Sequence, residues 1–469
     1  MHTRERYKVC SGHERTNTMK GHLLLLSCVS IALSLTYHGV NEAGAEFAPS
    51  NLPGANNKDY AFPTTSSIDW FIARGGNVFR IPFLWERLQP SLNGAFDATY
   101  FGLLDSIVNH TTKAGAFALI EPHNYIRYRG TPIGQGVRHS MHRYPLILLQ
   151  SVSTNDFKSF WKSLASRYAD NHRVIFGLMN EPNGVKTEDV RAAMQAGIEG
   201  IRSSGANQLI LVPGNAWTGA HSWFDSWYGT SNAQVMSNIT DPLNNFAYDI
   251  HQYFDGDYSG TNRDCKNGWN TESVFGKLTQ WLTQRKVKAF LSEFGFSQDE
   301  NCYHIAANVL DYLEAHSDAW SGWTYWAAGP WWGDYMYSVE PSGNGVADQW
   351  RRVLSNYMKS NGSVPTSKSS TTTKTLNPTS ESTTRQTTVQ TTQITSSTSQ
   401  VQTTVTAACS NHYGQCGGKN WNGAFCCEAP YICIFSNDWW RNAMFARDTV
   451  HYHSPEEQNE DAVGSDGSF

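Results

Sequence analysis

Leu178-Met179-Asn180-Glu181-Pro182 has a counterpart in Phe290-Leu291-Ser292-Glu293-Phe294-Gly295: in both segments of this 469-residue chain, one glutamate ends an apolar run. A short apolar run is typical of a strand that is buried on both faces, as in a parallel sheet. The two glutamates are therefore predicted to sit at the ends of two buried strands.

Similar runs recur along residues 36–362. The candidate strands are Tyr37–Asn41, Asn77–Pro82, Ala116–Glu121, Val174–Asn180, Gln208–Pro213, Phe246–His251, Lys288–Glu293 and Gly322–Trp326. Amphipathic segments fall between them, such as Asp156–Ala169, Thr187–Ser203 and Cys302–His316. Eight alternating units predict an α/β fold, a (β/α)8 TIM barrel rather than a doubly wound sheet. No GxGxxG or P-loop pattern follows a strand, which argues against a nucleotide site.

Polar residues gather at the predicted carboxyl ends of these strands, where a barrel carries its active site. They are Arg80, His123, Asn180, Glu181, His251, Tyr253, Glu293 and Trp326. Taken singly, either histidine could be a hydrogen-bonded core residue and Arg80 a structural ion pair. Eight such residues on six strands are harder to explain by packing alone. Two carboxylates on strand ends supply the acid and the nucleophile or base that glycosidic cleavage requires.

Six short segments carry a resemblance to a known family. They are Gly76–Pro82, Pro122–Tyr125, Met179–Pro182, Asp249–Tyr253, Ser292–Gly295 and Gly322–Trp326, and they follow the expected order. Together they resemble glycoside hydrolase family 5, and most closely its fungal secreted endo-β-1,4-glucanases (cellulases). The resemblance covers about Tyr37 to Tyr357 and implies hydrolysis of a polysaccharide with no metal or cofactor.

The resemblance also implies a retaining double displacement. Glu293 would be the nucleophile that forms a glycosyl-enzyme, and Glu181 would be the acid and then the base. Retention places two carboxyl groups about 5–5.5 Å apart. At that distance an ionised Glu293 disfavours ionisation of Glu181, which keeps the acid protonated.

The remaining roles follow from the same resemblance. Arg80 and Tyr253 would hydrogen-bond Glu293, His251 would lie near Glu181, and Asn180 would meet the sugar 2-hydroxyl. His123 would bind another hydroxyl.

Aromatic residues complete the predicted cleft. Trp326 would form the floor of the −1 subsite. Trp331 and Trp332 either extend the cleft or pack in the core. The resemblance further implies a disulfide, Cys265–Cys302, near the cleft.

The N-terminal region indicates export. Residues 20–34 have a basic start and an apolar core that is typical of a signal peptide and too short to span a membrane. Met19 is its natural start, so we interpret 1–18 as an extension, 19–34 as the signal and 35–362 as the catalytic domain. We expect a secreted, extracellular monomer. A net charge of −5 gives no basic field for nucleic acid.

The C-terminal region is predicted to hold a linker and a small module. More than half of residues 363–407 are Ser or Thr, which is typical of an extended O-glycosylated linker. Residues 408–443 resemble a fungal family 1 cellulose-binding module, whose flat aromatic platform would be Tyr413, Trp439 and Trp440. A zinc site is the alternative for this cysteine cluster, but the paired CxxC spacing is missing.

The module departs from its family at one cysteine. The resemblance implies the disulfides Cys416–Cys433 and Cys409–Cys426 within a disulfide-rich β fold. The last family cysteine is replaced by Ala443, which leaves Cys427 without a partner. Loss of one disulfide from so small a fold costs several kcal/mol. The tail 444–469 is unlike the family, and we interpret it as a mis-spliced or frameshifted end.

Residues 137–150 interrupt a loop that the family carries straight through. We interpret them as a retained intron, or else as a longer loop near the cleft. The primary hypothesis is an endo-β-1,4-glucanase. The alternatives are a xyloglucan- or mannan-active family 5 hydrolase, a non-catalytic carbohydrate-binding protein, and a damaged gene product that misfolds.

Overall fold

The computed structural model describes residues 34–134, 151–343 and 345–358, and the backbone of three strands between 415 and 445. The chain forms two units, 1–369 and 370–469. The predicted signal segment (apart from Ser34), the segment 137–150, the linker and the tail beyond 445 lie outside the described residues. So do the side chains of the proposed platform Tyr413, Trp439 and Trp440 and of Cys409, Cys416, Cys426 and Cys433.

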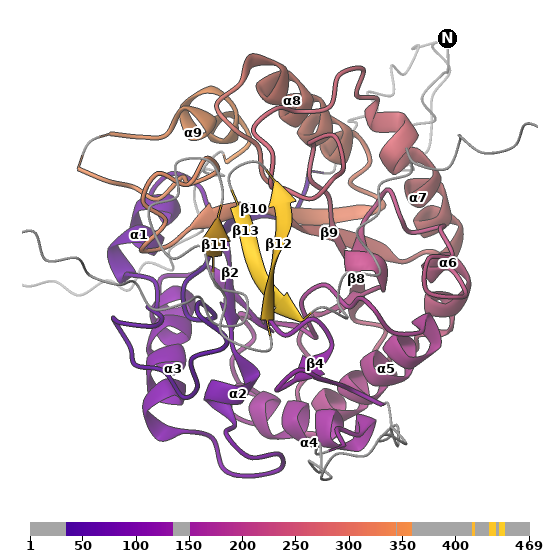
Figure 1. The fold of residues 1–469 in the computed structure, drawn as a ribbon. Helices are drawn as coiled ribbons and strands as arrows, with labels where there is room; N and C mark the ends of the chain where they lie inside the picture. The colour runs from indigo at the N-terminus through magenta and orange to yellow at the C-terminus, as the bar shows by residue number, and fades with distance from the viewer. Residues whose placement is uncertain are drawn as a thin grey trace, which may run out of the picture. The chain divides into compact units, whose positions relative to one another are not determined.

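Eight parallel strands close into a barrel in the first unit, which confirms the predicted (β/α)8 fold (Figure 1). Around the barrel the order is β1-β10-β9-β8-β7-β6-β3-β2. The strands are β1 (Tyr37–Glu42), β2 (Val78–Phe83), β3 (Phe117–Pro122), β6 (Val174–Gly177), β7 (Ile210–Pro213), β8 (Phe246–His251), β9 (Lys288–Glu293) and β10 (Trp320–Ala328). A short hairpin, β4 (Arg127–Tyr128) with β5 (Thr131–Pro132), follows β3.

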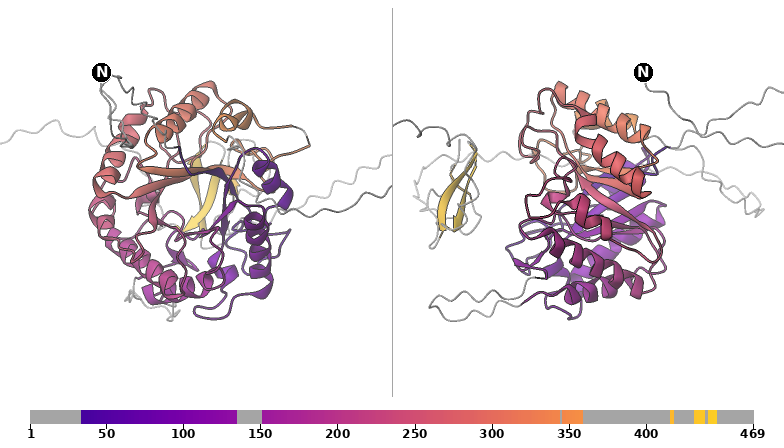
Figure 2. Two further views of the ribbon diagram at one scale, coloured as in Figure 1. Left: turned by 180° about the vertical axis from the view of Figure 1, so that it is seen from behind. Right: turned by 90° about the vertical axis from the view of Figure 1, so that its right-hand side faces the viewer.

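Helices surround the barrel on its outside, as the front, rear and side views show (Figures 1 and 2). They are α1 (Thr65–Ile72), α2 (Trp85–Leu88), α3 (Ala98–Lys113), α4 (Thr154–Ala165), α5 (Thr187–Ser203), α6 (Asn232–Val235), α7 (Thr271–Arg285), α8 (Glu300–Ala315) and α9 (Asp348–Arg352). Three 3-10 turns are η1 (Ala216–Thr218), η2 (Met236–Asn238) and η3 (Leu354–Asn356). Among the described residues, no helix is long and apolar enough to cross a bilayer.

Two local sequence features shape the start of α4 and its close packing against α5. Ser153 and Asp156 form a capping box that satisfies backbone donors at the start of α4. On α5, a Cβ at Gly200 would lie 2.3 Å from the carbonyl oxygen of Lys158 on α4. A glycine there lets the two helices approach.

All eight predicted strands exist, with ends shifted by up to three residues. The clearest correction concerns the strand that was predicted to run to Asn180. The ladder of β6 ends at Gly177, and Glu181 adopts a φ of 38°. A positive φ at a non-glycine residue is strained and is typical of functional sites. Glu181 therefore lies in the turn after β6 rather than directly at the strand end.

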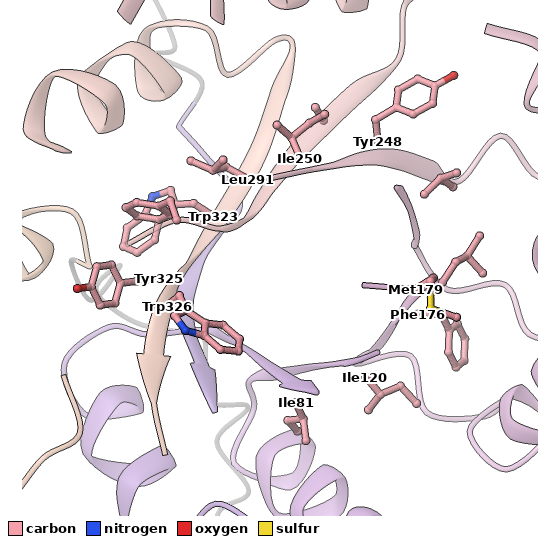
Figure 3. Packing of buried hydrophobic residues seen from close by; sticks show 14 of the residues in the cluster. Ile81, Ile120, Phe176, Met179, Tyr248, Ile250, Leu291, Trp323, Tyr325 and Trp326 are labelled. Carbon is pink, nitrogen blue, oxygen red and sulfur yellow. The ribbon is translucent and has the colours of Figure 1, made fainter. Parts of the chain in front are cut away.

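The barrel interior holds two layers of side chains. Nearer the amino ends of the strands lies an apolar layer: Val78, Leu119, Ile175, Leu211, Ala247 and Phe290. A polar layer lies two residues further along the same strands. Its buried members include Arg80, Glu121, Asp249 and Ser292. Side chains in between point outward to the helices, because strand residues alternate between faces. Figure 3 shows this alternation on β10, where Tyr325 and Trp326 point in opposite directions.

The second unit contains a small antiparallel sheet. Its strands β11 (Gln415–Gly417), β12 (Tyr431–Asn437) and β13 (Trp440–Phe445) are ordered β11-β13-β12. This agrees with the β module that the sequence predicted.

Candidate active site

Glu181 and Glu293 lie together at the carboxyl end of the barrel. One carboxylate oxygen of each and a ring nitrogen of His251 all lie within 4.8 Å of one another. Glu293 ends β9, and Glu181 is carried by the turn after β6. This spacing fits a retaining glycosidase, because an inverting enzyme separates its carboxyl groups by about 6.5–9.5 Å.

The surroundings shift the pKa values of the two carboxyl groups in opposite directions. Burial and the charge of Glu293 raise the pKa of Glu181 above its usual value. Burial alone would also raise the pKa of Glu293, but the positive charges of His251 and Arg80 outweigh it and lower that pKa. One carboxyl group is thus disposed to hold a proton and the other to be ionised, which are the states that acid and nucleophile need.

Arg80 anchors Glu293 from inside the barrel. Its Nη1 donates to Glu293 Oε2 at 2.8 Å, and its Nη2 lies 2.7 Å from Glu121 Oε2. The same guanidinium donates to Asn41 Oδ1 and to Asn180 Oδ1, each at 2.6 Å. The Tyr253 hydroxyl donates to the other oxygen of Glu293 at 2.7 Å. Both oxygens of Glu293 are therefore oriented, as the sequence predicted for Arg80 and Tyr253.

The polar layer requires room inside the barrel, which Gly177 provides. A Cβ at this position would lie 3.1 Å from the Cβ of Glu121. Any larger residue on β6 would press on Glu121 and so on its ion pair with Arg80.

His251 links Glu181 to groups deeper in the barrel. Its Nδ1 is 2.8 Å from Glu181 Oε1, and its Nε2 is 3.0 Å from Ser292 Oγ. The Ser292 hydroxyl donates in turn to Asp249. Burial would lower the pKa of His251, but the carboxylates of Glu293 and Glu181 raise it above the usual value. The predicted contact between His251 and Glu181 is present.

Asn180 and His123 form the opposite wall. Because Asn180 Oδ1 accepts from Arg80, its amide nitrogen must donate to His123 Nε2, 3.1 Å away. His123 Nδ1 then carries the proton and faces Glu121 Oε2 at 3.4 Å. His123 also stacks on Trp326, with ring centroids 5.6 Å apart. The eight residues predicted from the sequence are thus connected in one cluster.

Two tryptophans follow Trp326 in the loop after β10. Trp331 is 48% exposed and lines a cavity of about 520 Å³ together with Arg263 and Gln298. Trp332 is partly buried, and its ring meets Trp326 edge to face at 5.8 Å. Trp332 therefore packs against Trp326, whereas Trp331 is too exposed for core packing, and its role in the cleft stays a prediction.

Sequence reasoning missed the ring on the Glu181 side. Trp217 is 42% exposed, and its backbone N–H donates to Pro182 O at 3.1 Å, directly beside Glu181. Its neighbour Trp227 is also exposed and lies 6.5 Å away, centroid to centroid. Ala216, Trp217 and Thr218 all have positive φ. Nothing in their sequence signals this conformation.

Glu121, Asn41, Asp249 and Ser292 were also missed as site residues. Glu121 gave a signal that went unused, since it is an ionisable residue at the end of a predicted buried strand.

The predicted disulfide Cys265–Cys302 is present, with Cα atoms 5.3 Å apart. It joins the loop after β8 to the first turn of α8.

Glu181, His251 and Glu293 form the one trio among the described residues whose ligand atoms are close enough for a metal ion. These three side chains already have protein partners, however, because His251 is hydrogen-bonded to Glu181 and Glu293 forms an ion pair with Arg80.

A parallel barrel with two close carboxyl groups of opposed pKa shift defines a glycoside hydrolase. The sequence profile described as cellulase (glycosyl hydrolase family 5) matches residues 40–329, more than half of the chain. The chain therefore belongs to glycosyl hydrolase family 5. Residues 412–440 match the profile of the fungal cellulose binding domain, in line with the resemblance seen in the sequence.

Named relatives agree with this assignment. The chain is 39% identical over 323 residues to endo-beta-1,4-glucanase B of Aspergillus niger, which covers 69% of this chain and 90% of that protein. It is similar to the solved endo-beta-1,4-glucanase Xac0029 of Xanthomonas axonopodis pv. citri, with 38% identity, a TM-score of 0.65 and coverage of 69% and 99%. It is also similar to the solved Cel5A (EG2) of Hypocrea jecorina (Trichoderma reesei), with 30% identity and a TM-score of 0.60. That match covers 69% of this chain and 99% of the other.

Proposed function

We propose that this chain is an endo-β-1,4-glucanase that hydrolyses internal bonds of cellulose and related β-glucans with retention of configuration. The observation that carries the proposal is the Glu181–Glu293 pair, whose members lie within retaining distance and have pKa values shifted in opposite directions. The relatives named endo-β-1,4-glucanase support the choice of substrate.

In the first step, the carboxylate of Glu293 attacks the anomeric carbon of the sugar in the −1 subsite. The bond to the leaving oxygen breaks, and Glu181 gives that oxygen its proton. The products are an ester between the sugar and Glu293 and a free sugar end. Arg80 and Tyr253 aim the attacking carboxylate, because each holds one of its two oxygens.

In the second step, Glu181 removes a proton from a water molecule, which attacks the anomeric carbon. The ester bond breaks, Glu293 is released as a carboxylate, and the product keeps the β configuration. His251 lies against Glu181 and within 3.6 Å of Glu293, so its charge responds to both steps. We assign sugar hydroxyl contacts to Asn180 and His123, and ring stacking to Trp326.

Two exposed tryptophan rings are proposed to contact the glucan outside the −1 subsite. Trp217 lies beside Glu181 through its hydrogen bond to Pro182, and Trp331 is exposed in the loop after β10. We assign stacking on glucan residues outside the −1 subsite to these two rings.

The direct experiment measures reducing-sugar release from carboxymethylcellulose by the full chain, with mannan and xyloglucan in parallel. Glu293→Gln and Glu181→Gln should lower kcat by at least about 10²–10⁴-fold. Glu199→Gln, which changes an exposed carboxylate far from the cleft, is the matched control.

The outcomes separate the alternatives. Release from mannan or xyloglucan alone would keep the mechanism and replace the substrate. A folded protein that binds glucan but releases nothing would be the carbohydrate-binding alternative. A wild-type rate in Glu293→Gln would reject the catalytic assignment.

For the whole chain we propose export as a monomer that binds cellulose through its C-terminal module. The support is the signal-like segment 19–34, the linker 363–407 and the profile match at 412–440. We assign the platform to Tyr413, Trp439 and Trp440, and the remaining disulfides to Cys416–Cys433 and Cys409–Cys426.

A further inference from the structure

A pair of carboxyl groups outside the catalytic cluster is joined by a single hydroxyl. Ser67 Oγ on α1 lies 3.0 Å from Glu42 Oε1 at the end of β1 and 2.8 Å from Glu340 Oε2. One hydroxyl has one hydrogen, so it donates to only one carboxyl group and accepts from the other. The second hydrogen bond therefore needs a proton on one of the two carboxyl groups.

The burial of the two carboxyl groups identifies Glu42 as the one that holds this proton. Glu42 is fully buried, and its Oε2 has no hydrogen-bond partner among the described residues. An anionic oxygen in that position costs far more than a neutral one. Glu340 is half-buried, and the oxygen that contacts Ser67 also accepts the backbone N–H of Gly329 at 2.8 Å, so it has a second donor that Glu42 lacks.

Among the described residues, no cation forms an ion pair with Glu42 or Glu340. The charged group that faces Glu42 is Glu340, and the polar side chain that contacts Glu42 from α1 is Ser67. Burial and the charge of Glu340 raise the pKa of Glu42 well above its usual value.

The hydrogen bonds of Glu340 close a loop that reaches the cleft. This carboxylate binds the N–H of Gly329, so it joins the two ends of the Gly329–Glu340 loop. Within that loop, Trp332 donates to Ala328 O at 3.0 Å and packs edge to face on Trp326. Through Ser67, the loop is tied to Glu42 on β1.

We propose that Glu42 and Glu340 are positioning residues that share one proton through Ser67, and that this proton holds the Gly329–Glu340 loop and its tryptophans in place for glucan binding. When Glu42 loses its proton, two negative groups compete for one hydroxyl and the link opens. Glucan affinity therefore falls as the pH rises, separately from the titration of Glu181.

The first test measures KM and kcat for cellopentaose across the pH range and rests on the proposed function for its substrate. In the wild type, KM should rise several-fold at alkaline pH. Glu42→Gln should keep KM flat, because its amide donates to Ser67 at every pH, while kcat still falls with the titration of Glu181. An alkaline rise in KM that persists in Glu42→Gln would overturn the proposal.

A second variant protects the test against misfolding of the first. In Glu340→Gln the amide oxygen takes the place of Oε2, which accepts from both Ser67 and Gly329, so the loop stays closed. Because the charge of Glu340 raises the pKa of Glu42, its removal should move the alkaline rise in KM to lower pH. Glu46→Gln is the control, since burial raises the pKa of this nearby carboxyl group to about 7 but it has no contact with Ser67. A flat KM in Glu46→Gln alone would overturn the assignment to Glu42.

Two readouts do not depend on catalysis. Infrared difference spectra of the full chain above the usual glutamate pKa should show several protonated carboxyl components, one of which is lost in Glu42→Gln and retained in Glu46→Gln and Glu181→Gln. A raised folded-state pKa contributes stability at low pH that is lost as pH rises. The Tm of Glu42→Gln should accordingly gain on the wild type with rising pH. An unchanged band and parallel Tm curves would overturn the proton sharing even in an active enzyme.

Discussion

Val78 and Arg80 lie two residues apart on β2 and point to the same side of the sheet, yet they belong to different parts of the molecule. Val78 joins the apolar layer, whose hydrophobic contacts have no directional requirement. Arg80 joins the polar layer, where each partner is specific. Along each strand, the residues of the apolar layer thus contribute mainly to stability, and those of the polar layer contribute to the site.

The largest effect is expected from breaking the polar layer with Arg80→Met. Glu121 and Glu293 would lose their buried cation, and breaking such a pair costs about 3–5 kcal/mol. Because Arg80 lowers the pKa of Glu293, its removal should also move the acid limb of the pH–activity profile to higher pH. Chemical denaturation and a pH profile measure the two effects. An unshifted acid limb would contradict the role of Arg80.

Leu119→Ala makes the corresponding change in the apolar layer. Leu119 is fully buried, and the cavity should cost about 2–5 kcal/mol. We expect a lower Tm with kcat and both pH limbs unchanged, assayed well below the transition. If this variant shifted the pH limbs, the two layers would not be separable.

His251→Gln should move the pH profile with little loss of stability. The charge of His251 lowers the pKa of Glu181 and of Glu293, so its removal raises both. Both limbs should therefore shift to higher pH. Glu199→Gln serves as the control with no shift. Limbs that stay in place, or move to lower pH, would show that His251 is uncharged in the working enzyme.

The smallest effect is expected from deleting residues 137–150, none of which belongs to the described residues of either layer. Gly134 and Val152, the nearest hydrogen-bonded pair on either side, are joined by an N–H···O bond of 2.8 Å. The described residues on the two sides of the segment are thus joined directly to each other. We expect an unchanged Tm and unchanged or higher activity on carboxymethylcellulose. A deletion variant that fails to fold would show that the segment is part of the domain, against the retained-intron hypothesis.

The sequence predicted the barrel and the eight clustered residues because both depend on local patterns. Apolar runs mark strands, and polar residues at their ends mark the site. Glu121 was missed because its importance comes from Arg80 on the next strand, and strand periodicity gives the face of a residue but not its partner. Trp217 was missed because three consecutive left-handed residues without glycine hold it, and no local propensity predicts that turn.

Trapping of the glycosyl-enzyme tests the central claim most directly. The full chain is incubated with a 2-deoxy-2-fluoro cellobioside that carries a dinitrophenyl leaving group, and its peptides are then analysed by mass spectrometry. The account predicts one equivalent of sugar on the peptide that contains Glu293, and loss of labelling in Glu293→Gln. Labelling at another residue, or turnover of normal substrate with inversion and no trapped sugar, would contradict it.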